Sequence, residues 1–169
     1  MSEKIPAKLS DLAAAPYNPR RITEPAAAGL AASMAAFGDI AGLTWNVRTG
    51  HLVAGHQRAA QLRRRYGDLD LVDGALVAPD GQRWPVRVVD WDEATERAAN
   101  IAANSPTISG EWTDGLGDLL AQVAEGTPEL FGDLRLGELL EEDASPPDPR
   151  GDPPPEQIVC PSCGHRWAP

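Results

Sequence analysis

The most informative stretch of the chain is Leu52-Val53-Ala54-Gly55-His56-Gln57-Arg58. The first three residues are apolar, as expected for a short strand, whereas His56–Tyr66 is rich in residues that favour a helix. Gly55 stands between the two. A strand, a glycine and then a helix N-terminus is an arrangement that points backbone N–H groups at an anion, and Arg58 adds a guanidinium. The alternative is that Gly55 makes only a tight turn and Arg58 is a surface residue.

The residues before this stretch predict a helix and a hairpin. Thr23 is a suitable N-cap for a helix that continues to Phe37, with Leu30, Met34 and Phe37 on one stripe. Leu43–Val47 then has the character of a strand, joined to Leu52–Ala54 by four residues that include a glycine. We therefore expect a helix followed by a β-hairpin that leads directly into Gly55.

A second polar motif, Asn18-Pro19-Arg20-Arg21, precedes the helix. The residue before a proline avoids the helical region, so this motif is expected to be extended. Arg20 could join Arg58 in contacting phosphate oxygens, and His56 could donate a hydrogen bond to a phosphate or move a proton.

The chain continues with turn signals over 68–84, a short strand at Val86–Val89 and a helix from Asp92 to about Ala103. Four acids lie at the start of that helix: Asp90, Asp92, Glu93 and Glu96. They could help to hold Mg²⁺ beside a bound triphosphate, or they could serve as helix caps and dipole partners.

Charge is distributed unevenly along the 169 residues. The net charge is −10, yet residues 17–66 carry +5 and residues 67–157 carry −16. An anion site therefore belongs in the first third, and the acidic remainder repels DNA phosphates at long range. No apolar run approaches the roughly 18 residues that span a bilayer, and the charged N-terminus is unlike a secretory signal. These features predict a cytoplasmic protein that does not insert into a membrane.

The last third is predicted to be helical at first and then irregular. Leucines recur at helical spacing from Leu116 to Leu140, and residues 143–157 contain six prolines, which is typical of a disordered linker. The tail carries Cys160, Cys163 and His165. This group resembles half of a zinc site that a second chain could complete, and the alternative is a reduced thiol pair without a metal.

The aromatic residues could serve either in core packing or in ligand binding. Trp45, Trp84 and Trp91 flank predicted strands, so they are expected in or near the core, although one of them could stack on a base. Tyr17, beside the Asn-Pro-Arg motif, is the better candidate for stacking.

The order and spacing of these segments resemble a known family. Pro16–Arg20, the helix that ends at Phe37-Gly38, the strand Trp45–Val47 and Gly50–Arg58 together are similar to the N-terminal ParB domain and, more broadly, to the ParB/sulfiredoxin superfamily. The resemblance covers roughly residues 9–110. Asn104, Gly110-Glu111-Trp112 and the leucine-rich stretch from Leu116 to Leu140 are closest to phage-borne and methyltransferase-linked ParB-like domains.

The resemblance implies an α+β fold, with a small mixed sheet and helices, that binds CTP or ATP with Mg²⁺. The residues that it assigns to the nucleotide, together with their neighbours, are Asn18, Pro19, Arg20, Arg21, Gly55, His56, Gln57 and Arg58. Three departures stand out. His56-Gln57-Arg58 replaces the Glu-Arg-Arg of partition proteins, His56 replaces the catalytic cysteine of sulfiredoxin, and Ala54 replaces an acid of the serine kinase branch. Sulfiredoxin chemistry is therefore excluded.

These observations predict four parts: a nucleotide-binding domain at 1–110, an acidic helical extension at 111–142, a linker at 143–157 and a zinc-knuckle-like tail at 158–169. Residues 111–142 contain one arginine, Arg135, which disfavours sequence-specific DNA reading. The favoured function is a binding module in phage or bacterial DNA processing or partition-type regulation, with a methyltransferase as one partner class and a homodimer as one assembly. A ParB-like nuclease or slow NTPase and a non-catalytic protein adaptor are the alternatives.

Overall fold

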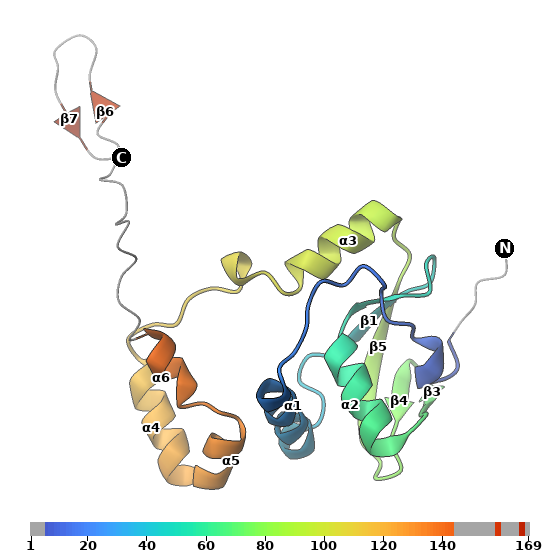
Figure 1. Cartoon of the computed structure of the whole chain (residues 1–169), viewed down its shortest axis with the longest axis horizontal. Coiled ribbons are helices and arrows are strands. Elements are labelled where there is room, and N and C mark those ends of the chain that lie inside the picture. The colour runs from blue at the N-terminus through green and yellow to red at the C-terminus, as the bar shows by residue number, and fades with distance from the viewer. Residues whose placement is uncertain (1–5, 144–157, 160–165, 168–169) are drawn as a thin grey trace. The chain divides into compact units, whose positions relative to one another are not determined.

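The structure is a computed structural model, and it describes residues 6–143, 158–159 and 166–167. These residues belong to two compact units, one ending at Leu136 and the other beginning at Gly137. The first unit contains a five-stranded sheet and most of the helices (Figure 1). Within the second unit, the described elements are the helix α6 (Glu138–Asp143) and the antiparallel strands β6 (Ile158–Val159) and β7 (Arg166–Trp167).

The sheet of the first unit has the order β2-β1-β5-β4-β3. Its strands are β1 (Leu43–Asn46), β2 (Leu52–Ala54), β3 (Asp70–Val72), β4 (Ala75–Val77) and β5 (Arg83–Val89). The central pair β1–β5 is parallel and the other neighbours are antiparallel, so the sheet is mixed. The expected α+β class with a small mixed sheet is confirmed.

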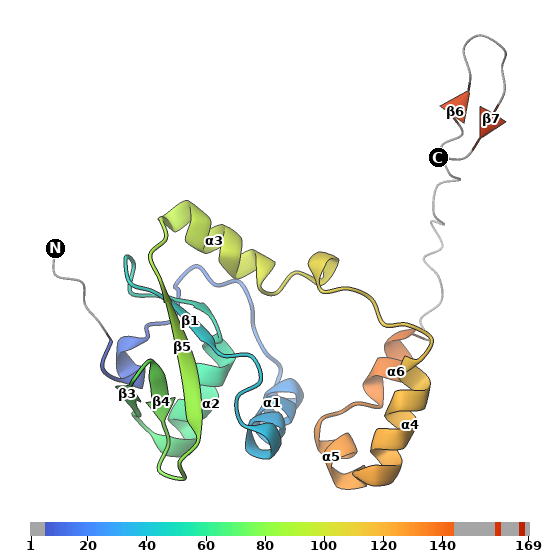
Figure 2. The ribbon, with the colours of Figure 1, turned by 180° about the vertical axis from the view of Figure 1, so that it is seen from behind.

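Two helices flank this sheet and meet beside it. They are α1 (Glu24–Phe37) and α2 (His56–Tyr66), and both views show α2 lying across one face of the sheet (Figures 1 and 2). Leu62 of α2 is completely buried in a core with Trp45 and Trp84. The two tryptophans are therefore core residues, Trp45 on β1 and Trp84 on β5.

Local signals in the sequence placed the helix ends correctly. The Thr23 hydroxyl oxygen accepts a hydrogen bond from Ala26 N–H at 3.3 Å, and Gly38 ends α1 with φ of +68°. Phe37 lies on the predicted apolar stripe of α1 but is not buried. Its side chain is 51% exposed, whereas Met34 is buried, because the stripe turns away from the core in the last helical turn.

The turn signals over 68–84 mark a hairpin that the sequence analysis left without strands. Asp73 and Gly74 have φ of +49° and +73°, which makes the tight two-residue connection between β3 and β4. Both strands have only three residues, too few for an alternating pattern to stand out. The hairpin is joined to the sheet through β4, which pairs with β5, and β3 pairs with β4 at the edge.

The helices after the sheet are α3 (Glu93–Ala102), the 3₁₀ turn η2 (Pro106–Ile108), α4 (Leu116–Gly126) and α5 (Pro128–Asp133). Leu116 and Leu120 form the buried side of α4, which packs against α5. Gly29 of α1 lies close to the backbone of Asp133, so α5 packs on α1. The predicted linker at 143–157 and the residues Cys160, Cys163 and His165 fall outside the described residues, apart from Asp143.

The boundaries proposed at 110, 142 and 157 stay predictions. In the described structure, α4 and α5 belong to the first unit and α6 to the second. None of the helices in the described part of the chain has the length and apolar character that crossing a bilayer requires.

Gly55 is the glycine on which the β2–α2 connection depends. Its φ is +88°, and a Cβ added there would lie 3.1 Å from Leu43 Cγ and 3.2 Å from Gly42 O. Gly55→Ala is therefore expected to lower the free energy of unfolding by about 1–3 kcal/mol, measured by urea denaturation.

Gly81 provides the matched control because its φ is +86° and a Cβ there would meet nothing within 4 Å. Gly81→Ala should cost less than Gly55→Ala, since it adds backbone strain without a clash. Equal costs for the two variants would show that the close approach to β1 is unimportant.

Candidate functional site

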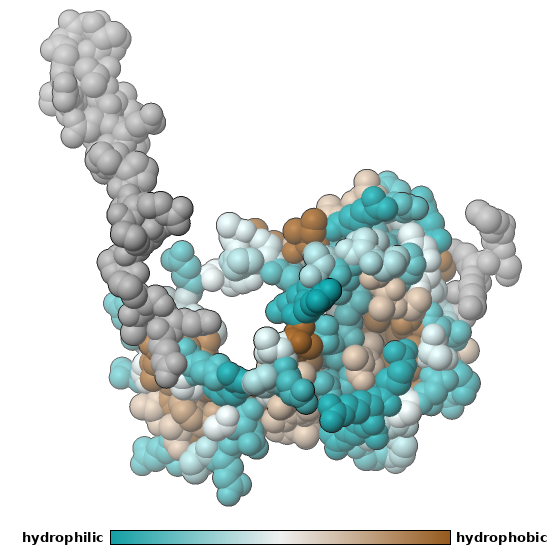
Figure 3. Space-filling model, viewed as in Figure 1, coloured by the Kyte–Doolittle hydropathy of each residue, from teal (hydrophilic) through white to brown (hydrophobic). Residues whose placement is uncertain are grey.

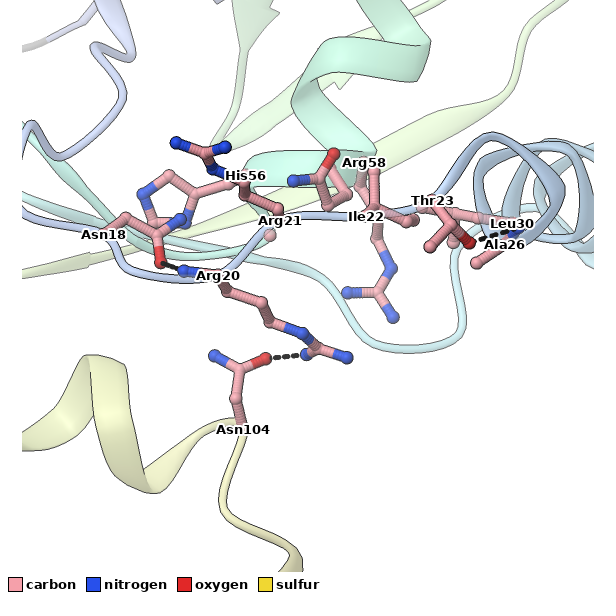
Figure 4. A pocket seen from close by; sticks show the side chains of 12 residues that line it. Asn18, Arg20, Arg21, Ile22, Thr23, Ala26, Leu30, His56, Arg58 and Asn104 are labelled. Carbon is pink, nitrogen blue, oxygen red and sulfur yellow. Dashed lines mark hydrogen bonds between the residues drawn. The ribbon is translucent and has the colours of Figure 1, made fainter. Parts of the chain in front are cut away.

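A pocket of about 450 Å³ lies between the loop that precedes α1 and the start of α2 (Figure 4). Its wall is made by residues from four segments: Asn18, Arg20, Arg21, Ile22, Thr23, Ala26, Leu30, Gly55, His56, Gln57, Arg58 and Asn104. We call it pocket 1. The two polar motifs singled out in the sequence, which lie more than thirty residues apart, thus meet at one place.

The N-terminus of α2 forms one side of pocket 1. Gly55 is the N-cap in the left-handed conformation and no side chain caps the helix there. The first N–H groups of a helix have no partner within the helix, and they carry the positive end of its dipole. This end of α2 therefore favours negative charge in pocket 1. The absent Cβ of Gly55 faces β1, so the glycine is required for packing the turn as well as for opening the site.

The loop before α1 supplies two arginines whose guanidinium groups differ in their contacts. Arg20 donates from Nη1 to the side-chain oxygen of Asn104, while its backbone N–H bonds Asn18 Oδ1 at 3.2 Å. Arg21 is exposed and makes no ion pair with the described residues. Figure 4 shows the side chains of Arg20 and Arg58 reaching into the same open space.

His56 is held in place by the backbone. Its Nε2 accepts a hydrogen bond from Ala15 N–H at 3.2 Å. Burial, together with the charge of His51, lowers the pKa of His56 below its usual value, so the ring is neutral at pH 7. With Nε2 occupied, the hydrogen resides on Nδ1, which makes His56 a candidate donor of one hydrogen bond.

All of the predicted nucleotide residues except Pro19 line pocket 1. Pro19 instead lines a neighbouring cavity of about 390 Å³, which Asn18, Arg20 and Asn104 also border. Asn104 had been noted only for its resemblance to phage-type domains, and it was missed as a pocket residue. It lies more than eighty residues from Arg20 in the sequence, so only the fold brings the two together.

The acids proposed for Mg²⁺ have other roles. Asp90 pairs with Arg48 at 2.7 Å, Asp92 caps α3 by accepting from Thr95 N–H at 2.8 Å, and Glu93 pairs with Arg97 at 3.1 Å. None of them lines pocket 1. Within the described ranges, no cluster of three or more histidine, cysteine or acidic side chains is arranged to hold a metal ion.

Glu96 is the exception among these acids because its side chain is buried. Its carboxylate accepts hydrogen bonds from Tyr17 Oη at 2.5 Å, from Thr49 Oγ1 and from Asn46 Nδ2, and His51 Nδ1 lies 3.4 Å away. Burial by itself raises the pKa of Glu96, but these hydrogen bonds outweigh it and hold the pKa below its usual value. Glu96 is therefore an ionised carboxylate inside the fold.

Tyr17, the stacking candidate, is engaged in the same cluster. Burial and the bond to Glu96 raise the pKa of its hydroxyl, so it stays a donor. The Arg97 guanidinium lies 5.4 Å from the centre of its ring, and His51 meets the ring edge-on. Tyr17 fixes the start of the Asn18–Arg21 loop and does not line pocket 1.

Comparison with solved structures shows a similarity of fold. The chain resembles the crystal structure of the C-terminally truncated chromosome-partitioning protein ParB from Caulobacter crescentus complexed with CTP-γ-S, with a TM-score of 0.53 and 18% identity over 76% of this chain and 68% of that one. No family model and no curated protein matches the sequence. The similarity establishes a ParB-like fold.

Because the folded pKa of Glu96 lies below the ordinary 4.5, its ionised form stabilises the fold above that pH. This contribution is lost as the pH falls through the folded pKa. We expect Glu96→Gln to lower the free energy of unfolding at pH 7 by about 1–3 kcal/mol, because a buried donor is left facing the new amide. We also expect it to flatten the acid limb of the stability profile, measured by denaturation from pH 7 to pH 3.

Glu93→Gln is the control, since this exposed acid loses only a surface ion pair. Its acid limb should match that of the parent protein. A Glu96→Gln variant that keeps the full parental pH dependence would contradict the assigned role.

Proposed function

We propose that pocket 1 binds a nucleoside triphosphate, CTP or ATP, with its phosphates against Arg20, Arg58 and the N-terminus of α2. The observation that carries this proposal is the convergence of three arginines and an uncapped helix start on a pocket that contains no acidic side chain. Guanidinium groups bind phosphate oxygens through paired hydrogen bonds, and backbone N–H groups at a helix start add further donors.

The size and charge of the pocket fit such a ligand. Small-molecule sites commonly enclose roughly 300–1,000 Å³, and pocket 1 encloses about 450 Å³. Arg21 and Arg58 form no ion pair with the described residues, even though acids outnumber bases in the chain. Their charge is thus available to a ligand. The solved ParB structure with a similar fold contains a CTP analogue, which supports the proposal.

Magnesium is expected to arrive with the nucleotide. Mg²⁺ at triphosphates is commonly held by phosphate oxygens, water and one or two carboxylates. Because no carboxylate lines pocket 1, phosphate oxygens and water would be its principal ligands here. The protein would contribute by neutralising the remaining phosphate charge with arginine.

The proposed role is a nucleotide-binding module in DNA processing or partition-type regulation. The titratable side chains that line pocket 1 are three arginines and the neutral His56. This set of side chains suits binding better than acid–base chemistry. The helices α4 and α5 carry Asp118, Glu125, Glu129 and Asp133 but no arginine or lysine. They are poorly suited to reading base edges, so regulation through a protein partner is favoured.

Arg58→Ala should weaken triphosphate binding by roughly 10- to 100-fold, corresponding to about 1.5–3 kcal/mol for hydrogen bonds to a charged group. The measurement is calorimetric titration with CTP, ATP and GTP in the presence of Mg²⁺. Arg87→Ala is the matched control because Arg87 lies on β5 and contacts the Trp91 ring.

Unchanged affinity in Arg58→Ala, or an equal loss in Arg87→Ala, would contradict the phosphate-binding role. If none of the three nucleotides binds the parent protein, the proposal fails and the alternative of a non-catalytic protein adaptor is favoured.

A further inference from the structure

A second concave surface adjoins pocket 1 and is not used by the proposed nucleotide. It encloses about 820 Å³ between α1 and α2, and we call it pocket 2. Its lining residues are Ile22, Thr23, Glu24, Ala27, Ala28, Ala31, Gln61, Arg64 and Arg65. Ile22 and Thr23 line both pockets, so the two adjoin at the start of α1.

The two sides of pocket 2 differ in chemistry. On the α1 side the wall is made of alanines, which leave room because no long side chain fills it. On the α2 side it is polar, and Gln61 holds the helices together by donating to Ala27 O at 3.3 Å. The result is a groove with a small-residue wall facing a basic one.

Helical spacing makes the basic wall continuous between the pockets. Arg58, Gln61 and Arg65 stand at i, i+3 and i+7, which places them along one face of α2, and Arg64 flanks them. From Arg58 to Arg65 the helix rises about 10 Å. Figure 3 shows hydrophilic and apolar surface side by side in the region where α2 lies.

Two of the three arginines along the groove lack a carboxylate partner among the described residues. Arg48 and Arg97 each pair with an acid, at 2.7 and 3.1 Å. Arg58 and Arg64 pair with none among the described residues, and Arg65 is 3.9 Å from Asp80. Glu24 is the one acid that lines pocket 2. Positive charge is thus left uncompensated along the groove in a chain of net charge −10.

We infer that pockets 1 and 2 form one groove for a single nucleic-acid strand, with a nucleotide unit in pocket 1 and the adjoining backbone phosphates against Arg64 and Arg65. This inference rests on the proposed function, because pocket 1 anchors the strand. Successive phosphates of a strand lie a few ångströms apart, so a basic wall of about 10 Å faces more than one of them. The arginines of the groove all come from one helix, α2, so they present a single row of cations to one strand.

The lining of the groove also indicates how the strand is held. Pocket 2 has no aromatic side chain on which a base could stack. Contacts therefore go to phosphate and sugar, which makes the binding dependent on salt and largely independent of sequence. The alanine wall is suited to the sugar C–H surface, and the arginine wall is suited to the phosphates.

The test is binding of a fluorescein-labelled single-stranded 12-mer of mixed sequence to the full chain, followed by anisotropy at several salt concentrations. Arg64→Ala/Arg65→Ala should weaken binding by about tenfold or more, since hydrogen bonds to charged groups are lost. The slope of log K against log salt should fall by about 1.4, or about 0.7 for each lost phosphate contact. Triphosphate binding in pocket 1 should stay at the parental level.

The control is Arg83→Ala/Arg87→Ala, which removes the same charge from β5, away from the groove. It should bind the strand as the parent does. Because Arg65 also packs over the Tyr66 ring at 4.9 Å, the single variant Arg64→Ala provides a test that leaves this contact intact. It should weaken strand binding in the same direction.

Several outcomes would overturn the inference: no strand binding by the parent, equal losses in groove and control variants, tighter binding of a duplex, or equally effective competition by an acidic peptide. The two proposals are separable. If the protein binds a triphosphate but no strand, the strand-binding inference is refuted and the nucleotide proposal stands. If it binds a strand in an Arg64-dependent way but no triphosphate, the nucleotide proposal is refuted and the phosphate-binding role of Arg64 stands.

Discussion

The first unit is organised around a buried negative charge. The Glu96 carboxylate would be very costly to bury alone, and the fold supplies donors from three separate segments: Tyr17 before the loop, Asn46 on β1 and Thr49 in the hairpin turn. Each donor is useful only if its segment is in the correct place. Satisfying one carboxylate therefore fixes the N-terminal loop, the hairpin and α3 relative to one another.

This constraint extends along α3 toward the pocket. Glu96 and Asn100 are spaced four residues apart and lie on one face of the helix, and Asn104 follows just after its C-terminal end. Asn100 donates to Val53 O at 2.8 Å and Asn104 binds Arg20, so α3 is attached to the sheet and the loop by polar contacts. Its apolar residue Ile101 is 65% exposed. The helix thus faces the core with its polar side, which reverses the usual amphipathic arrangement.

The buried polar face of α3 explains why the sequence predicted some residues of the fold and the site but not others. Local rules were sufficient for Gly55 as the residue between strand and helix and for Asp92 as the cap of α3, because each depends on neighbours a few residues away. They failed for Glu96, whose position predicts a dipole partner or a magnesium ligand rather than a buried acid, and for Asn104, whose partner is distant in sequence. The site motifs were found by residue type, whereas the residues that hold them in place required the three-dimensional fold.

The electrostatics of the first unit depend on which of its charged side chains have partners. The acids of α3 are occupied by a cap, an ion pair and the buried cluster, and none of them pairs with Arg21, Arg58 or Arg64. At distances beyond about 8–10 Å a bulky polyanion experiences the negative charge of the whole chain, screened by salt. At contact it meets the uncompensated arginines. A small or narrow anion that enters the groove gains the local attraction with little of the long-range repulsion, which favours a nucleotide or a single strand over bulk DNA.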